Sequence, residues 1–130
     1  MGWDADLVTF VGGKQVKIAE AGDWNYTHNT NAMISAVLED AGHGDKVGSA
    51  WWNELRKEKG NYWCDALAGL TGTDGAELLG LIVAGLEADP GRFRAMNPAN
   101  GWGDYDRLLN VLKDMRRASV EWPEAVWSIS

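Results

Sequence analysis

The sequence predicts an α+β fold in which a small antiparallel sheet of about three strands packs against several helices. Three observations predict it. A β-rich segment near the N-terminus is followed by a Gly-Gly pair and a second, alternating segment; several later segments carry apolar residues at helical spacing; and the last residues alternate again. With 130 residues, 45% of them apolar, residues 1–130 fit one domain with one hydrophobic core.

The sheet is predicted from both ends of the chain. Residues 5–11 are rich in β-forming side chains, Gly12-Gly13 supplies a turn, and residues 14–19 alternate, which together predict a hairpin. Residues 125–129 alternate as well. We expect this terminal strand to pair with the hairpin, because a lone hairpin is only marginally stable.

The first helices follow the hairpin. Residues 31–41 carry apolar side chains at helical spacing, and Gly42 is suited to end that helix. A polar, glycine-rich loop is expected over residues 42–48, and a shorter helix over residues 49–60. Residues 62–70 remain ambiguous between a loop and one or two helical turns.

A longer helix is predicted from about Asp74, where Asp74 and Glu77 resemble a capping box, to the Asp-Pro-Gly stop at residues 89–91. Gly80 and Gly85 lie inside it, and each costs about 1 kcal/mol relative to alanine. We therefore expect a neighbouring backbone or ring to approach the helix closely at these glycines.

The last helix is predicted over residues 104–118, after a helical turn near residues 92–96 and a loop at residues 97–101. Helical spacing assigns its buried face to Tyr105, Leu108, Leu109, Leu112 and Met115, and its wet face to polar residues that include Arg107. Asp104 is a natural N-cap.

Charge and cysteine content limit the classes of function. The net charge is −7 and the acidic residues are spread along the chain, so we expect no binding to nucleic acid, which needs clustered lysine and arginine. Cys64 is the one cysteine, so an intrachain disulfide is excluded, in agreement with a reducing compartment. No leader and no apolar run near the ~18 residues of a membrane helix is visible. We expect a cytoplasmic protein without membrane contact.

Two polar, aromatic clusters are the candidate site. The first, residues 23–31, is expected at a strand-to-helix junction, where the unpaired N–H groups of the helix N-terminus favour binding of an anion. The second, residues 97–105, precedes and begins the last helix. We expect the two clusters to face one another across a cleft that binds a small polar ligand. The candidate ligand-binding residues are Asn25, Tyr26, His28, Asn29, Trp102 and Tyr105. The alternative is structural: asparagines hold turns and caps while the aromatic rings fill the core.

The same clusters carry a family resemblance. Residues 25–29 read N-Y-T-H-N and residues 97–105 read N-P-A-N-G-W-G-D-Y. These motifs resemble a family of small, uncharacterised proteins of actinobacteria, other bacteria and their phages. The resemblance covers most of the chain and is weakest over residues 42–70. It implies a shared core and a shared polar site, and a role as a phage accessory protein by analogy alone.

Catalytic and metal sites have little support. His28 and His43 lack the spacing of metal-binding motifs, although Asp23, Asp40 and Asp45 lie near them in sequence. No metal or cofactor is expected. Cys64 has no neighbouring base or cation that would activate it.

The sequence therefore predicts a non-enzymatic accessory protein that binds a small polar or nucleotide-like ligand. One alternative is an acidic, tryptophan-rich module that interacts with or inhibits a host protein, with Trp51 or Trp52 exposed. A third hypothesis is an enzyme with His28 as its general base.

Overall fold

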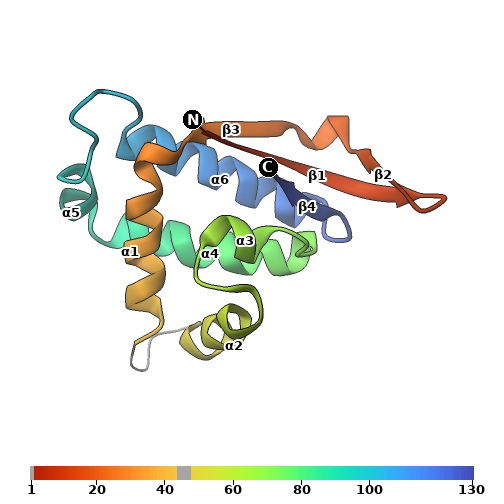
Figure 1. Ribbon diagram of the computed structural model, residues 1–130, viewed down its shortest axis with the longest axis horizontal. Helices are drawn as coiled ribbons and strands as arrows, with labels where there is room; N and C mark the ends of the chain where they lie inside the picture. Colours follow the sequence, from red (N-terminus) through yellow and green to blue (C-terminus); the bar gives the residue numbers. More distant parts are fainter. Residues whose placement is uncertain (1, 44–47) are drawn as a thin grey trace.

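The computed structural model describes residues 2–43 and 48–130 (Figure 1). Within these residues it has four strands and six α-helices, which confirms the α+β fold class. The strands are β1 (Gly2–Val11), β2 (Lys14–Lys17), β3 (Asp23–Thr27) and β4 (Val126–Ile129), with short 3₁₀ turns η1 (Ala19–Ala21) and η2 (His28–Thr30) beside β3. The helices are α1 (Asn31–Ala41), α2 (Ser49–Lys59), α3 (Trp63–Leu67), α4 (Gly72–Ala88), α5 (Pro90–Arg94) and α6 (Tyr105–Glu121).

The antiparallel sheet is built around β1. Val8 pairs with Lys17 of β2 on one edge and with Val126 of β4 on the other. Nearer the N-terminus, Ala5 and Asp6 of β1 pair with β3 on one side and with β4 on the other. Strands β2 and β3 therefore lie along the same edge of β1, opposite β4. The predicted hairpin and the pairing of the terminal strand are confirmed.

Strand β3 was not predicted as a separate strand, and it explains how the first polar cluster is placed. Val8 pairs with Lys17 and Asp6 pairs with Asp23. The segment that runs back along β1 therefore contains four more residues between these pairs than β1 does. These extra residues form η1 and the turn at Gly22, and they divide one long return strand into β2 and β3. The first cluster therefore begins inside the sheet.

The core lies between one face of the sheet and the helices. Along β1, Trp3, Ala5 and Leu7 are buried and alternate with the exposed or half-buried Gly2, Asp4 and Asp6, and Val8 after them is buried as well. Figure 1 shows the helices on one side of the sheet, with α6 and α4 stacked beneath it. Five tryptophans are buried: Trp3, Trp24, Trp52, Trp63 and Trp127. Trp51 is half-buried, while the indole of Trp52 donates to the Leu38 carbonyl at 3.0 Å.

Helix α4 begins earlier than predicted. Thr71 is its N-cap and accepts the Asp74 N–H at 3.2 Å, so the proposed capping box at Asp74 is wrong. A Cβ on Gly72 would lie 2.0 Å from the Trp122 carbonyl oxygen, and a Cβ on Gly85 would lie 2.3 Å from a Val37 methyl. The expected close approach is therefore found at Gly85, although it is made by an aliphatic side chain.

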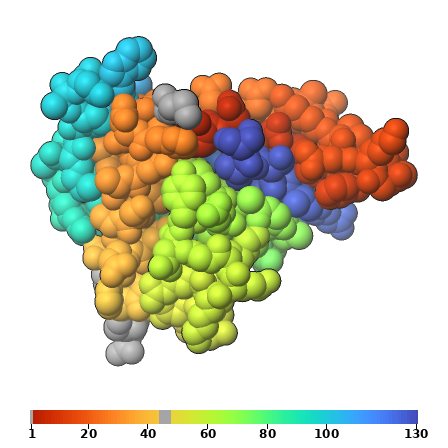
Figure 2. Space-filling model, viewed as in Figure 1, coloured from red at the N-terminus to blue at the C-terminus, as the bar shows by residue number. Residues whose placement is uncertain are grey.

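The β1–β2 hairpin extends beyond the helical layer, as Figure 1 and Figure 2 show. Gly12 and Gly13 turn it with φ values of +58° and +79°. Phe10, Val11 and Val16 are exposed because none of the described helices covers this end of the sheet (Figure 1). None of the helices in the described ranges is both long and apolar enough to span a membrane.

Candidate functional site

The two polar clusters meet in space although they lie more than 70 residues apart in sequence. The Tyr26 hydroxyl oxygen accepts the Asp104 N–H at 2.9 Å, and the Asn29 side-chain amide donates to the Trp102 carbonyl at 3.3 Å. A Cβ on Gly103 would lie 2.4 Å from the Thr27 methyl. The loop before α6 is thus packed directly onto the end of β3.

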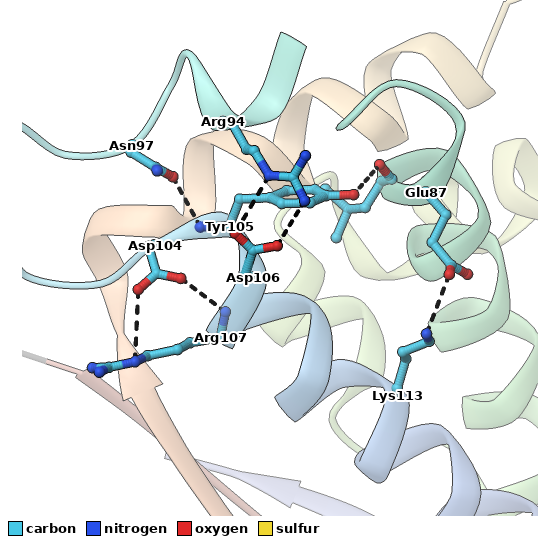
Figure 3. A network of polar contacts seen from close by, with 9 residues as sticks. Glu87, Arg94, Asn97, Asp104, Tyr105, Asp106, Arg107 and Lys113 are labelled. Carbon is cyan, nitrogen blue, oxygen red and sulfur yellow. Dashed lines mark hydrogen bonds and ion pairs between the residues drawn. The ribbon is translucent and has the colours of Figure 1, made fainter. Parts of the chain in front are cut away.

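Side-chain hydrogen bonds hold that loop in shape. Asn97 Oδ1 accepts the Tyr105 N–H and Asp104 Oδ1 accepts the Arg107 N–H, both at 2.9 Å (Figure 3). Asn100 Oδ1 accepts the Trp102 N–H at 2.9 Å. These polar residues perform the turn and cap roles of the structural alternative. Their effect is to present Trp102 on an ordered backbone.

A hollow of about 650 Å³ lies where the clusters meet. Its lining includes the polar side chains of Asp4, Asn25, Thr27 and Arg107, and Trp102 is 71% exposed beside them. The lining residues are Gly2, Trp3, Asp4, Asn25, Tyr26, Thr27, Gly101, Trp102, Gly103 and Arg107. Three of the predicted site residues, Asn25, Tyr26 and Trp102, therefore line one hollow, and Asn29 is hydrogen-bonded to its wall.

The groups in this hollow offer complementary chemistry. The Arg107 guanidinium is exposed and lies 3.7 Å from the Asp104 carboxylate, so it remains open to a second anion. The Asn25 side chain makes no hydrogen bond with another described residue and can both donate and accept. Trp3 is buried beside the hollow, and within the described chain its indole N–H has no acceptor.

Tyr105 does not wall the hollow, contrary to the sequence-based prediction. Its ring is 1% exposed and its hydroxyl donates to the Leu86 carbonyl at 2.7 Å. The ring stacks on Phe93 with centroids 6.3 Å apart. It lies under the guanidinium of Arg94, which pairs with Asp106 (Figure 3). Burial raises the pKa of Tyr105. As the first residue of α6, it turns inward and anchors that helix to α4 and α5.

His28 does not line the hollow at Trp102. It lines a second hollow, of about 450 Å³, with Tyr62, Cys64 and Asp65. Its imidazole makes no hydrogen bond or ion pair with another described side chain. Burial raises the pKa of Cys64 to about 11 and that of Tyr62 to about 12, so both groups are protonated near neutral pH. Within the described residues, no side chain is hydrogen-bonded to His28 in a way that would orient its imidazole as a general base.

Sequence reasoning missed Asp4 and Arg107 as parts of the site. Asp4 was missed because β3 was not predicted as a separate strand, and the register of β3 on β1 sets Asn25 opposite Asp4. The available signal was alternation: in D-W-N-Y-T the aromatic residues fall on one face and Asn25 on the other. Arg107 was assigned only to the wet face of the last helix.

The described part of the chain contains no cluster of side chains that could hold a metal ion. Within residues 2–43 and 48–130, no three histidine, cysteine or acidic side chains lie close enough together to hold an ion. Asp45, which the sequence placed near His43, lies outside the described residues.

Comparison with known proteins found no matching family model, no significantly similar curated protein and no significantly similar solved structure.

Proposed function

We propose that this protein binds a small, polar, nucleotide-like ligand in the hollow between β1, β3 and the loop before α6, without catalysing a reaction on it. The main support for this proposal is the exposure of Trp102. Its residue is 71% exposed, while its carbonyl accepts a hydrogen bond from Asn29 and its N–H donates one to Asn100, so its backbone is ordered. A large ring held in water on an ordered loop can stack on a ligand at a small cost in conformational entropy.

The neighbouring groups define the class of ligand. The indole face of Trp102 suits a planar ring, because bases stack on aromatic side chains. The guanidinium of Arg107 suits a phosphate or carboxylate, and the amide of Asn25 suits a polar ring edge. A ligand with a planar polar ring and one anionic group would use all three residues. By analogy with the phage members of the family that the motifs resemble, the role would be that of an accessory protein that sequesters its ligand.

Binding is tested first on the protein as purified from cells. Native mass spectrometry at neutral pH should show a small molecule retained on the 14.2 kDa chain and released on denaturation. Calorimetric titration with nucleoside monophosphates, nucleosides and inorganic phosphate then separates the contributions of the ring and the anion. Absence of a retained molecule together with absence of saturable binding across this panel would contradict the proposal.

Variants locate the binding. Trp102→Ala and Arg107→Gln should each weaken binding by about 1–3 kcal/mol, roughly 5- to 150-fold, with little effect on stability because both side chains are exposed. Phe10→Ala and Lys14→Gln are matched controls outside the hollow, and they should leave affinity unchanged. If the two hollow variants and the two control variants lost the same amount of binding affinity, this hollow would be excluded as the binding site.

A second candidate function, a protein-interaction module, is favoured by the hairpin tip. Phe10 is 57% exposed, and Val11 and Val16 of the same hairpin are exposed as well. An apolar strand edge open to water marks a contact site for another chain. A photo-crosslinking residue at position 10 should capture a defined partner in cells, whereas one at the exposed Glu20 should not. Equal labelling from both positions would remove this candidate.

A further inference from the structure

Asp4 lines the hollow at Trp102, and its side chain has no partner within the described protein. Its carboxylate is exposed and makes no hydrogen bond or ion pair with any other residue in ranges 2–43 and 48–130. A carboxylate accepts hydrogen bonds and does not donate them. The hollow therefore presents an open acceptor for N–H groups as well as the guanidinium of Arg107, which suits an anion.

The sheet holds the side chains of Asp4 and Asn25 next to each other. Asp4 pairs with Asn25 of β3. On its other side, the Asp4 N–H donates to the Ser130 backbone oxygen at 2.9 Å, and the Asp4 carbonyl accepts the Ser130 N–H at 2.8 Å. Because both backbone groups of Asp4 point towards Ser130, Asp4 and Asn25 form a non-hydrogen-bonded pair, in which the side chains approach most closely. A carboxylate and an amide thus lie side by side on ordered backbone.

We propose, on the basis of the nucleotide-like ligand inferred above, that the planar ring bound in this hollow is guanine and that Asp4 selects it. Guanine has two adjacent donors, N1–H and the 2-amino group, beside its O6 acceptor. The Asp4 carboxylate accepts both donors in parallel, in the geometry that a carboxylate uses with arginine. The Asn25 amide donates to O6, the Trp102 indole stacks on the ring, and Arg107 binds the phosphate.

The other bases match the Asp4 carboxylate less well. On the same edge, adenine and cytosine place a ring-nitrogen acceptor beside their amino group, and this acceptor would face the carboxylate oxygens. Uracil offers one donor between two carbonyls. A bidentate pair of this kind discriminates between bases by about 5- to 150-fold. Asp4 is therefore a specificity-determining residue, while Trp102 and Arg107 act on any nucleotide.

Calorimetric titration of the wild-type protein with guanosine, inosine and adenosine monophosphates tests this selection. Guanosine monophosphate should bind most tightly. Inosine monophosphate, which lacks the 2-amino group, should bind more weakly, and adenosine monophosphate should bind about tenfold or more below guanosine monophosphate. This series uses the wild-type chain alone, so its result does not depend on the folding of a variant.

Two matched variants assign the selection to one carboxylate. Asp4→Asn should lower the ratio of guanosine to adenosine monophosphate affinity about tenfold. Asp6→Asn removes the same charge from the same face of β1, two residues further along and outside the hollow, and should leave this ratio unchanged. Urea denaturation checks that both variants are folded.

The outcomes separate this proposal from the proposed function. Equal affinity for guanosine and adenosine monophosphates, or an Asp4→Asn variant that keeps the wild-type ratio, would overturn guanine selection by Asp4 and leave nucleotide binding in place. Absence of saturable binding for all three nucleotides would overturn both.

Discussion

Replacing Gly103 by alanine tests how closely the two polar clusters are packed. Gly103 has φ of +97°, where an L-residue costs about 1–2 kcal/mol. The added methyl would lie 2.4 Å from the Thr27 methyl, and overpacking of this kind costs about 1–3 kcal/mol. The expected loss in the free energy of unfolding is therefore about 3 kcal/mol. For a chain of this length that corresponds to a melting temperature lower by roughly 10 °C.

Two further variants separate the cost of backbone strain at Gly103 from the cost of the contact between its added methyl group and Thr27. Gly101 has φ of +74°, but a methyl added at its Cα would meet no neighbour within 4 Å, so Gly101→Ala should cost about 1–2 kcal/mol from strain alone. Thr27→Ser removes the clashing methyl and keeps the Oγ that accepts the Asn29 N–H at 3.2 Å. Combined with Gly103→Ala, it should recover about 1–2 kcal/mol.

Urea denaturation of the four variants and the wild type measures these differences. If Gly103→Ala cost no more than Gly101→Ala, the close contact between the clusters would be refuted. Absence of coupling between positions 27 and 103 in the double variant would refute it independently.

Three further predictions concern the surroundings of the site. Tyr105→Phe should lower the free energy of unfolding by about 1–2 kcal/mol, measured in urea, because it leaves the buried Leu86 carbonyl without its donor. Cys64, with its pKa raised to about 11, should react with iodoacetamide at pH 8 about 100-fold more slowly in native protein than in urea; equal rates would contradict its burial. The pKa of Asp114 is lowered by hydrogen bonds from Arg117 and then from the indole of Trp24, so its stabilising effect is complete above the unfolded value near pH 4 and is lost as the pH falls through the folded value. Thermal melts from about pH 5 to pH 2 should therefore show a smaller loss of stability for Asp114→Asn than for wild type.

Much of the fold could be predicted where local pattern and tertiary packing agree. The helix over residues 31–41 has the predicted bounds because its apolar spacing and Gly42 specify both its face and its end. Helix α4 was misplaced at its start because Asp74 was predicted to be its N-cap, which left Gly72 outside the helix. Gly72 and Gly75 are required by close contacts with Trp122 and Trp127 near the C-terminus, which no local pattern reveals.

The candidate site was predictable only in part. The meeting of the two clusters was anticipated from their composition, and Asn25, Tyr26 and Trp102 do line one hollow. Tyr105 was named as a ligand-binding residue although its helical spacing also assigned it to the buried face of the last helix, and the structure confirms the buried position. The separation of His28 was missed because η2 turns the chain directly after β3. Each error came from assuming that residues adjacent in sequence point to the same side.

The eight tryptophans provide the most direct test of ligand binding at the hollow. Each indole N–H gives its own resonance in a ¹H–¹⁵N correlation spectrum, and Trp102→Phe assigns the signal from the hollow. Titration with nucleoside monophosphates should shift the Trp102 signal most, with saturation, while the buried Trp52 and Trp127 signals stay in place. If the Trp102 signal stayed still while others moved, or if none moved, the hollow would not be a ligand-binding site.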